Sequence, residues 1–125
     1  MPREPRLYLE DILRACEKIG RYTAGMDQAA FVADERTYDA VVRNLEIIGE
    51  AAKRLPPDTC QAMPQIEWRK VAGMRDWLAH AYFGIDADIL WDVVENHVPQ
   101  LEQTIATFLH TPREKSEERS SKYED

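Results

Sequence analysis

The chain has 125 residues, which is enough for one domain and too few for two independent hydrophobic cores. With 16 basic and 23 acidic residues its formal net charge is −7, which argues against a protein whose whole surface coats nucleic acid. No apolar run is long enough to cross a membrane and no secretory segment opens the chain, so we expect a cytoplasmic protein with no membrane partner. In a reducing compartment, Cys16 and Cys60 are expected to be free thiols that pack as small apolar residues.

Apolar residues recur at three- and four-residue spacing along the chain, which predicts an all-α fold. The first helix is expected over about residues 6–20. Asp27 is a suitable cap for a short turn that ends at Phe31. The second long helix is expected to begin at a cap at Asp34 and to end before Pro56.

The residue pattern in the second half of the chain predicts one further turn and two more helices. The turn is expected within residues 57–64, and a third helix is expected to begin near Glu67 and to be broken by residues 83–85. Asp86 is expected to cap a fourth helix. Pro99 lies inside this last helix, where its missing amide donor predicts a kink.

Each long helix carries one apolar face, and these faces are predicted to form a single core. The predicted members are Leu9, Ile12, Leu13, Cys16, Ile19, Tyr38, Val41, Val42, Leu45, Ile48, Ala52, Leu55, Val71, Met74, Leu78, Ile89, Leu90, Val93, His97, Leu101, Ile105 and Phe108. His97 is thus expected to be a packed core histidine, whereas His110 is expected to interact with the dipole at a helix end.

Charge is distributed unevenly along the chain. Residues 53–75 are locally basic, whereas residues 84–110 contain no lysine or arginine. Residues 111–125 have almost no apolar side chains. We therefore expect one helical domain over residues 1–110 and a polar, disordered tail over residues 111–125.

The segment over residues 75–82 gathers three groups whose joint chemistry suits phosphodiester cleavage. His80 can transfer a proton near neutral pH, and Arg75 offers a planar cation to the charge that builds up on phosphate. Tyr82 lies seven residues after Arg75 and shares its helix face. The alternative is that His80 is a satisfied or capping histidine, Arg75 with Asp76 an ordinary surface pair, and Tyr82 part of the core.

Helix geometry separates the two main groups of this segment. Five residues rotate a side chain by roughly 140° and raise it by about 7.5 Å, so Arg75 and His80 do not share a face of an ideal helix. They could meet if the helix is distorted near Gly84, if the arginine wraps around, or if a second copy of the chain supplies one group. Asp76 is four residues before His80 and could orient its imidazole.

A row of charged residues runs along the second long helix. Its members are Arg36, Asp39, Arg43, Glu46, Glu50 and Lys53. A solvated face with i,i+4 pairs is the favoured explanation. If the row instead faces the third helix, Arg43 and Glu46 are candidates to support Arg75 and His80. The sequence has no paired histidines or CxxC spacing that would favour a metal site, and no cofactor is expected.

Three stretches resemble the HepT family of HEPN-domain toxin ribonucleases. They are the R-x-x-x-x-H-x-Y motif over residues 75–82 with the preceding residues 68–74, the run NLEIIGEAAKRL over residues 44–55, and YFGID over residues 82–86. The resemblance covers about residues 7–110. It implies a HEPN-type bundle, for which we expect four to five helices in up-and-down order.

The resemblance also implies a function and its partners. The chain would form a homodimer in which two motifs border one RNA-binding cleft, and it would cut RNA without a metal, His80 acting as acid and base on the ribose 2′-hydroxyl and Arg75 stabilising the phosphate. It would be the toxin of a type VII-like toxin–antitoxin system, and a larger hetero-oligomer with the antitoxin is the alternative to a homodimer alone. The antitoxin, an MNT-type nucleotidyltransferase, would block it by transferring AMP from ATP to Tyr82. No DNA substrate is expected.

Two other functions stay open at this point. The chain could be a non-catalytic, nucleotide-binding or scaffold module that binds a minimal nucleotidyltransferase through its acidic fourth helix. The chain could also be a metal-dependent hydrolase.

Overall fold

Helices make up most of the protein that the computed structural model describes, which is residues 3–81 and 86–110; no strand occurs in these ranges. In chain order the elements are α1 (Pro5–Tyr22), α2 (Gln28–Ala33), α3 (Glu35–Lys53), α4 (Pro57–Gln61), α5 (Trp68–Ala72), α6 (Met74–Ala81), α7 (Ala87–Asp92), the π-helical turn η1 (Val93–His97) and α8 (Val98–His110). The predicted all-α fold is confirmed.

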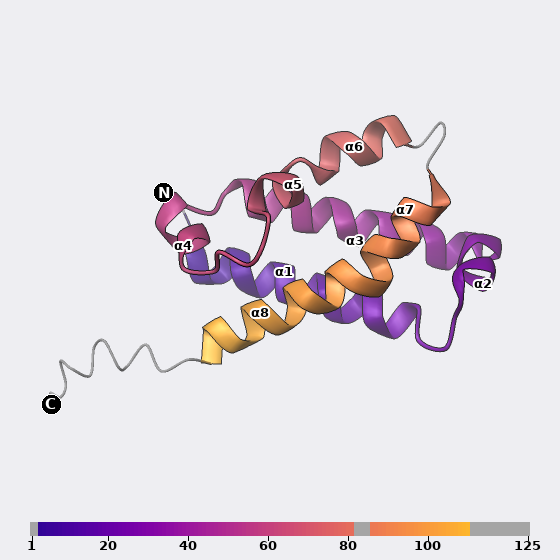
Figure 1. The fold of residues 1–125 in the computed structure, drawn as a ribbon, viewed down its shortest axis with the longest axis horizontal. Helices are drawn as coiled ribbons and strands as arrows, with labels where there is room; N and C mark the ends of the chain where they lie inside the picture. The colour runs from indigo at the N-terminus through magenta and orange to yellow at the C-terminus, as the bar shows by residue number, and fades with distance from the viewer. Residues whose placement is uncertain (1–2, 82–85, 111–125) are drawn as a thin grey trace, which may run out of the picture.

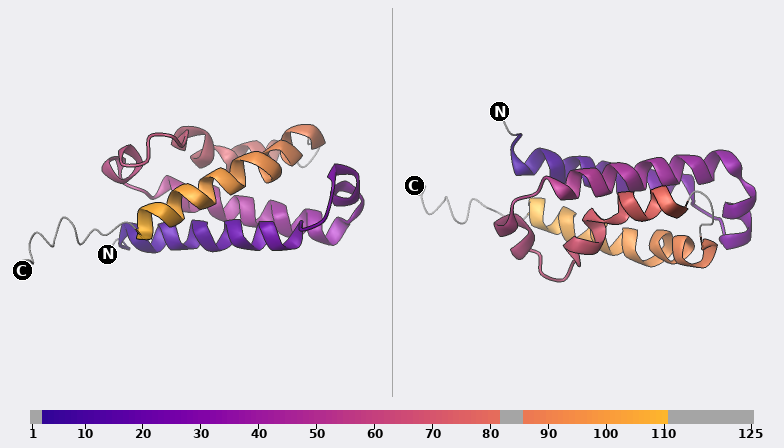
Figure 2. Two further views of the ribbon diagram at one scale, coloured as in Figure 1. Left: turned by 60° about the horizontal axis from the view of Figure 1, so that its bottom comes forward. Right: turned by 90° about the horizontal axis from the view of Figure 1, so that it is seen from above.

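The longer elements form an up-and-down bundle. Helices α1 and α3 lie side by side and run in opposite directions (Figures 1 and 2). The α5–α6 segment packs on α3, and the last helical segment, η1 with α8, returns across α1. Four helical rods therefore enclose one core, in which α3 is the rod that contacts both α1 and α6.

Most of the core follows the predicted apolar faces. Side chains of α1, α3 and α8 that are almost completely enclosed include Ile12, Ile19, Leu45, Ile48 and Ile105. Leu13, Tyr38, Val71, Met74, Val93 and Phe108 pack against this core while remaining partly exposed. Cys16 is buried, and burial raises the pKa of its thiol, whereas Cys60 is only half-buried.

The three predicted aspartate caps are confirmed. Asp27 accepts a hydrogen bond from the Ala30 amide at 2.9 Å, and Asp34 accepts one from the Thr37 amide at 3.1 Å. Asp86 accepts from two amides in the first turn of α7, at 3.0 and 3.3 Å. Each carboxylate satisfies amide donors that a helix start leaves without a partner inside the helix.

The single helix predicted from Glu67 is two helices in the structure. α5 ends at Ala72, α6 begins at Met74, and Gly73 forms a turn between them. Glycine weakens a helix interior because it loses the most backbone freedom on folding, so a short break at this residue has a physical cause. The further break predicted at residues 83–85 lies outside the described residues.

The prediction that His97 packs in the core is wrong. Its side chain is 61% exposed, and Val94 and Val98 are buried in its place. The cause is the π-helical turn η1, in which the Val98 amide bonds to the Val93 carbonyl, five residues back. This wider turn shifts the inward face relative to a regular helix. Ile89, also predicted to be buried, is 48% exposed.

Close to Pro99, where the sequence predicts a kink, the helix has this π-helical turn, which ends two residues before the proline. His110 is the exposed last residue of α8, the position predicted for it. Within the described ranges, no helix combines the length and the apolar character that crossing a bilayer requires.

Candidate functional site

Arg75 lies in the first turn of α6 and reaches across to α3. Its Nη1 donates to Oε1 of Glu50 at 2.8 Å, and its side chain is 56% exposed. The charged row on α3 therefore faces α6 at this point, instead of being only a solvated surface. The cation is held in a defined place and is still accessible to a ligand.

Gly49 allows α3 and the α5–α6 junction to approach this closely. A Cβ atom on Gly49 would lie 3.2 Å from the Arg75 amide nitrogen and 3.3 Å from the Val71 carbonyl oxygen. Both neighbours are backbone atoms, so room for a side chain here would require the backbone of the α5–α6 junction to shift by a few tenths of an ångström. The missing side chain thus sets the distance between the backbone that carries Glu50 and the backbone that carries Arg75.

A groove of about 600 Å³ opens around this ion pair. Four arginines and three carboxylates line it: Arg3, Arg43, Arg54, Arg75, Asp11, Glu46 and Glu50. Arg3 pairs with Asp11 at 2.8 Å, and its guanidinium lies 4.7 Å from the centre of the Tyr8 ring. The arginines exceed the carboxylates by one, so the groove is locally basic in a chain of net charge −7.

Glu50 is shared between two arginines of this groove. Arg54 Nη2 donates to Oε2 at 3.1 Å while Arg75 donates to Oε1. The hydrogen bond from Arg54 and the charge of Arg75 hold the pKa of the Glu50 carboxyl below its usual range. Glu50 is therefore ionised at neutral pH. Because these pairs are exposed to solvent, an incoming phosphate can replace the carboxylate at little cost.

The predicted supporting residues Arg43 and Glu46 line the same groove. They approach each other, with Arg43 Nη1 3.7 Å from Glu46 Oε1, and the contact to Arg75 comes from Glu50 instead. Sequence reasoning placed Glu50 in the charged row but missed this role. The signal that could have found it is its neighbour Gly49, a helix-weakening residue in the middle of a long helix.

His80 is in α6, one residue before the end of that helix, and its side chain lies outside what the structure describes. Helix α6 is α-helical from Met74 to Ala81, so no helix distortion between Arg75 and His80 brings them to one face. Asp76 is exposed and lies one turn before His80. Tyr82 and Gly84 lie outside the described residues. The assignment of His80 and Tyr82 to the site stays a prediction.

Metal-ligating side chains do not gather in this part of the molecule. Among the side chains of residues 3–79 and 86–110, no group of three or more His, Cys, Asp or Glu residues is arranged to hold an ion. The arginines of the groove offer permanent cations and hydrogen-bond donors, a combination that suits binding of a phosphodiester.

Comparison with known proteins agrees with this chemistry. Three relatives have names that denote ribonucleases. "Probable ribonuclease HepT" of Thermococcus cleftensis is 46% identical over 101 residues, which is 81% of this chain and 92% of that protein. A "Putative RNase" of Methanocaldococcus jannaschii is 45% identical over 79% of this chain and 83% of its own. A "Putative RNase" of Caldanaerobacter subterraneus is 40% identical over 86% of this chain and 96% of its own.

No solved structure matched the chain. The family model described as "Ribonuclease HepT-like" matches residues 12–108, which include α3, the α5–α6 junction, Glu50 and Arg75. The chain belongs to the HepT-like ribonuclease family.

Proposed function

We propose that this chain is a metal-independent endoribonuclease and the toxin of a toxin–antitoxin pair. The observation that carries the proposal is Arg75, an exposed cation held by Glu50 in a locally basic groove between α3 and α6. Membership of a family whose relatives have ribonuclease names supports RNA as the phosphodiester.

In the proposed reaction the substrate supplies its own nucleophile. His80 removes the proton of a ribose 2′-hydroxyl, the oxygen attacks the adjacent phosphorus, and the bond from phosphorus to the 5′-oxygen breaks. The leaving 5′-oxygen takes up a proton from the protonated imidazole, which returns to its neutral form, and a 2′,3′-cyclic phosphate remains on the other fragment. Arg75 exchanges Glu50 for the phosphate and stabilises the charge of the pentacoordinate state. Asp76 orients the imidazole from one turn before it.

We further propose that two copies of the chain form the working cleft. Positions 75 and 80 are on different faces of a regular α6 helix. Arg75 of one copy and His80 of the other can therefore form one active site without a distortion of either helix. A homodimer would also place two locally basic grooves along one RNA.

A cleavage assay with the purified chain and single-stranded RNA tests the proposed activity. We expect cleavage to continue at full rate in excess chelator, with products that end in a 2′,3′-cyclic phosphate. Loss of cleavage in chelator, with recovery on adding a divalent metal, would assign the protein to metal-dependent hydrolases. A chain that cuts no RNA but binds a nucleotidyltransferase would be the non-catalytic module.

The proposed antitoxin is an MNT-type nucleotidyltransferase that transfers AMP from ATP to Tyr82. Anionic phosphates added beside the motif would pair with Arg75 and repel the RNA backbone. Intact mass is expected to rise by whole AMP units after incubation with ATP and this partner, and RNA cleavage is expected to stop. Tyr82→Phe is expected to show neither change, whereas Tyr8→Phe, in the groove, is expected to be modified as fully as the wild type. An equal mass gain in Tyr82→Phe would rule out this site.

The close approach at Gly49 makes a separate prediction about how Arg75 is positioned. Gly49→Ala adds a Cβ that must push the backbone of Arg75 and Val71 away, so we expect slower RNA cleavage. The strain also opposes the gain in helix propensity, which is about 0.5–1 kcal/mol for glycine to alanine. Cleavage rate and thermal unfolding measure the two effects.

Gly20→Ala is the matched control for this variant. Gly20 lies in α1 with no atom within 4 Å of an added Cβ. Gly20→Ala should therefore be stabilised by the higher helix propensity of alanine, by roughly 0.5–1 kcal/mol in the free energy of unfolding, and should cleave RNA like the wild type. If Gly49→Ala were stabilised as much as Gly20→Ala and cleaved at the wild-type rate, the contact at Gly49 would have no part in placing Arg75.

A further inference from the structure

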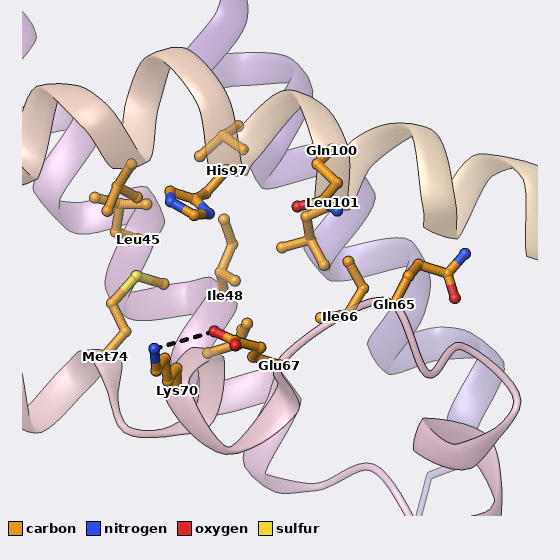
Figure 3. Close-up of a pocket in the computed structure, with 13 residues that line it drawn as sticks. Leu45, Ile48, Gln65, Ile66, Glu67, Lys70, Met74, His97, Gln100 and Leu101 are labelled. Carbon is orange, nitrogen blue, oxygen red and sulfur yellow. Dashed lines mark ion pairs between the residues drawn. The ribbon is translucent and has the colours of Figure 1, made fainter.

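A second cavity, of about 460 Å³, lies between α3, the α5–α6 segment and the start of α8. Leu45 and Ile48 of α3 and Leu101 of α8 line its apolar interior, and Met74 and Ile66 close it on the other side (Figure 3). Its volume is in the range that accommodates a small organic ligand. Arg75 and Glu50 do not line it, so this cavity is separate from the groove described above.

Five polar side chains line this cavity, and all but the glutamate carry N–H groups that can donate hydrogen bonds. They are Gln65, Glu67, Lys70, His97 and Gln100. Lys70 pairs with Glu67 at 3.1 Å, but both side chains are more than 70% exposed, so the pair is weak and a bound anion can replace Glu67. Figure 3 shows Lys70 and His97 on opposite sides of the opening, one from α5 and one from η1.

The π-helical turn gives His97 its position at this opening. Asp92 and His97 are five residues apart, a spacing that in a regular α-helix separates side chains by roughly 140°. In the wider turn, His97 Nε2 lies 3.1 Å from Asp92 Oδ2. Asp92 is itself held by Asn96, whose Nδ2 donates to Oδ1 at 2.7 Å. This network fixes the imidazole at the cavity opening, and its second ring nitrogen can donate a hydrogen bond to a ligand when the ring is protonated.

We propose that this cavity binds a small amphipathic anion, with its apolar body on Leu45, Ile48 and Leu101 and its carboxylate, phosphate or sulfonate between Lys70 and His97. We choose an anion over a cation because four of the five polar lining side chains carry N–H donors, and the two carboxylates beside them, Glu67 and Asp92, are each paired with one of those donors. A purely apolar ligand would use none of the donors at the opening. The site does not depend on RNA cleavage, and its test does not require the proposed activity.

The test uses two fluorescent probes that share one apolar body. 1-Anilinonaphthalene-8-sulfonate carries an anionic group, whereas N-phenyl-1-naphthylamine has almost the same rings and no charge. Titration of the full chain with the sulfonate is expected to saturate at one probe per chain. The neutral probe is expected to bind about tenfold more weakly, since it lacks charge-assisted hydrogen bonds to the protein.

Variants of the opening locate the binding. Lys70→Gln and His97→Gln are each expected to weaken binding of the sulfonate about tenfold and to leave the neutral probe unchanged. Lys53→Gln and His110→Gln remove the same groups away from the cavity and are expected to change neither. Gln100→Trp places a large ring at an exposed position of the opening, where the fold is not strained, and is expected to weaken binding of both probes.

Three results would overturn the proposal. They are failure of the sulfonate probe to bind, equal affinity for the two probes, and sulfonate binding that survives Gln100→Trp.

Discussion

A His80→Ala variant is expected to cleave RNA about 10²- to 10⁴-fold more slowly than the wild-type chain, the range that general acid–base groups contribute. The imidazole is the only group of residues 75–82 with an ordinary pKa near neutrality, so no neighbour in this segment can replace it. The measurement is the single-turnover rate on a defined RNA. Growth arrest on expression of the chain alone should disappear in parallel.

His110→Ala is the control for this variant. His110 is exposed at the end of α8 and contributes to neither cavity, so its loss should leave the cleavage rate unchanged. If His80→Ala and wild type cleaved RNA at the same rate, the acid–base role of His80 would be wrong. If neither variant nor wild type cleaved RNA, the non-catalytic module would be the better description of the chain.

An Arg75→Ala variant is expected to lose about 10²- to 10³-fold in kcat, the usual cost of removing one group that stabilises transition-state charge. Its fold should be retained, because the pair with Glu50 is 56% and 41% exposed and exposed pairs add little stability. Arg75→Lys should recover only part of the rate, because an ammonium group cannot form two parallel bonds to a phosphate. Rate and thermal unfolding are measured together.

Arg54→Ala distinguishes this catalytic role from simple attraction of RNA to the groove. Arg54 binds the same carboxylate from the other side and has the same charge. We expect Arg54→Ala to raise KM and to leave kcat nearly unchanged, since Arg54 would contact the substrate equally in the ground and transition states. Equal losses of kcat in both variants would show that the groove acts through its total charge and that Arg75 has no special place.

Local signals predicted the helix starts correctly because each depends on neighbouring residues. A carboxylate at Asp27, Asp34 or Asp86 needs only the amides two or three residues later, and all three caps formed. The apolar faces of α1 and α3 were predicted equally well, because regular helices preserve the three- and four-residue spacing over their whole length.

Where a helix departs from regular geometry, the same spacing gave the wrong face. In the last helical segment the π-helical turn exposes His97 and buries Val94 and Val98. Pro99 signalled a disturbance nearby, but a missing amide donor does not specify whether the helix bends or widens. Similarly, Gly73 divides the predicted third helix just before Arg75, a break that the periodicity of the sequence did not reveal.

The sequence by itself determined the helical class, the buried faces of the regular helices and the segment that carries Arg75 and His80, because these properties follow from residue type and short-range spacing. Only the tertiary structure decided that Glu50 holds Arg75 and that Arg43 and Glu46 line the same groove. Residues 50 and 75 are 25 positions apart, and their contact depends on how closely two helices pack. That distance is set by the missing side chain of Gly49, whose Cβ would meet the backbone of the opposite helix.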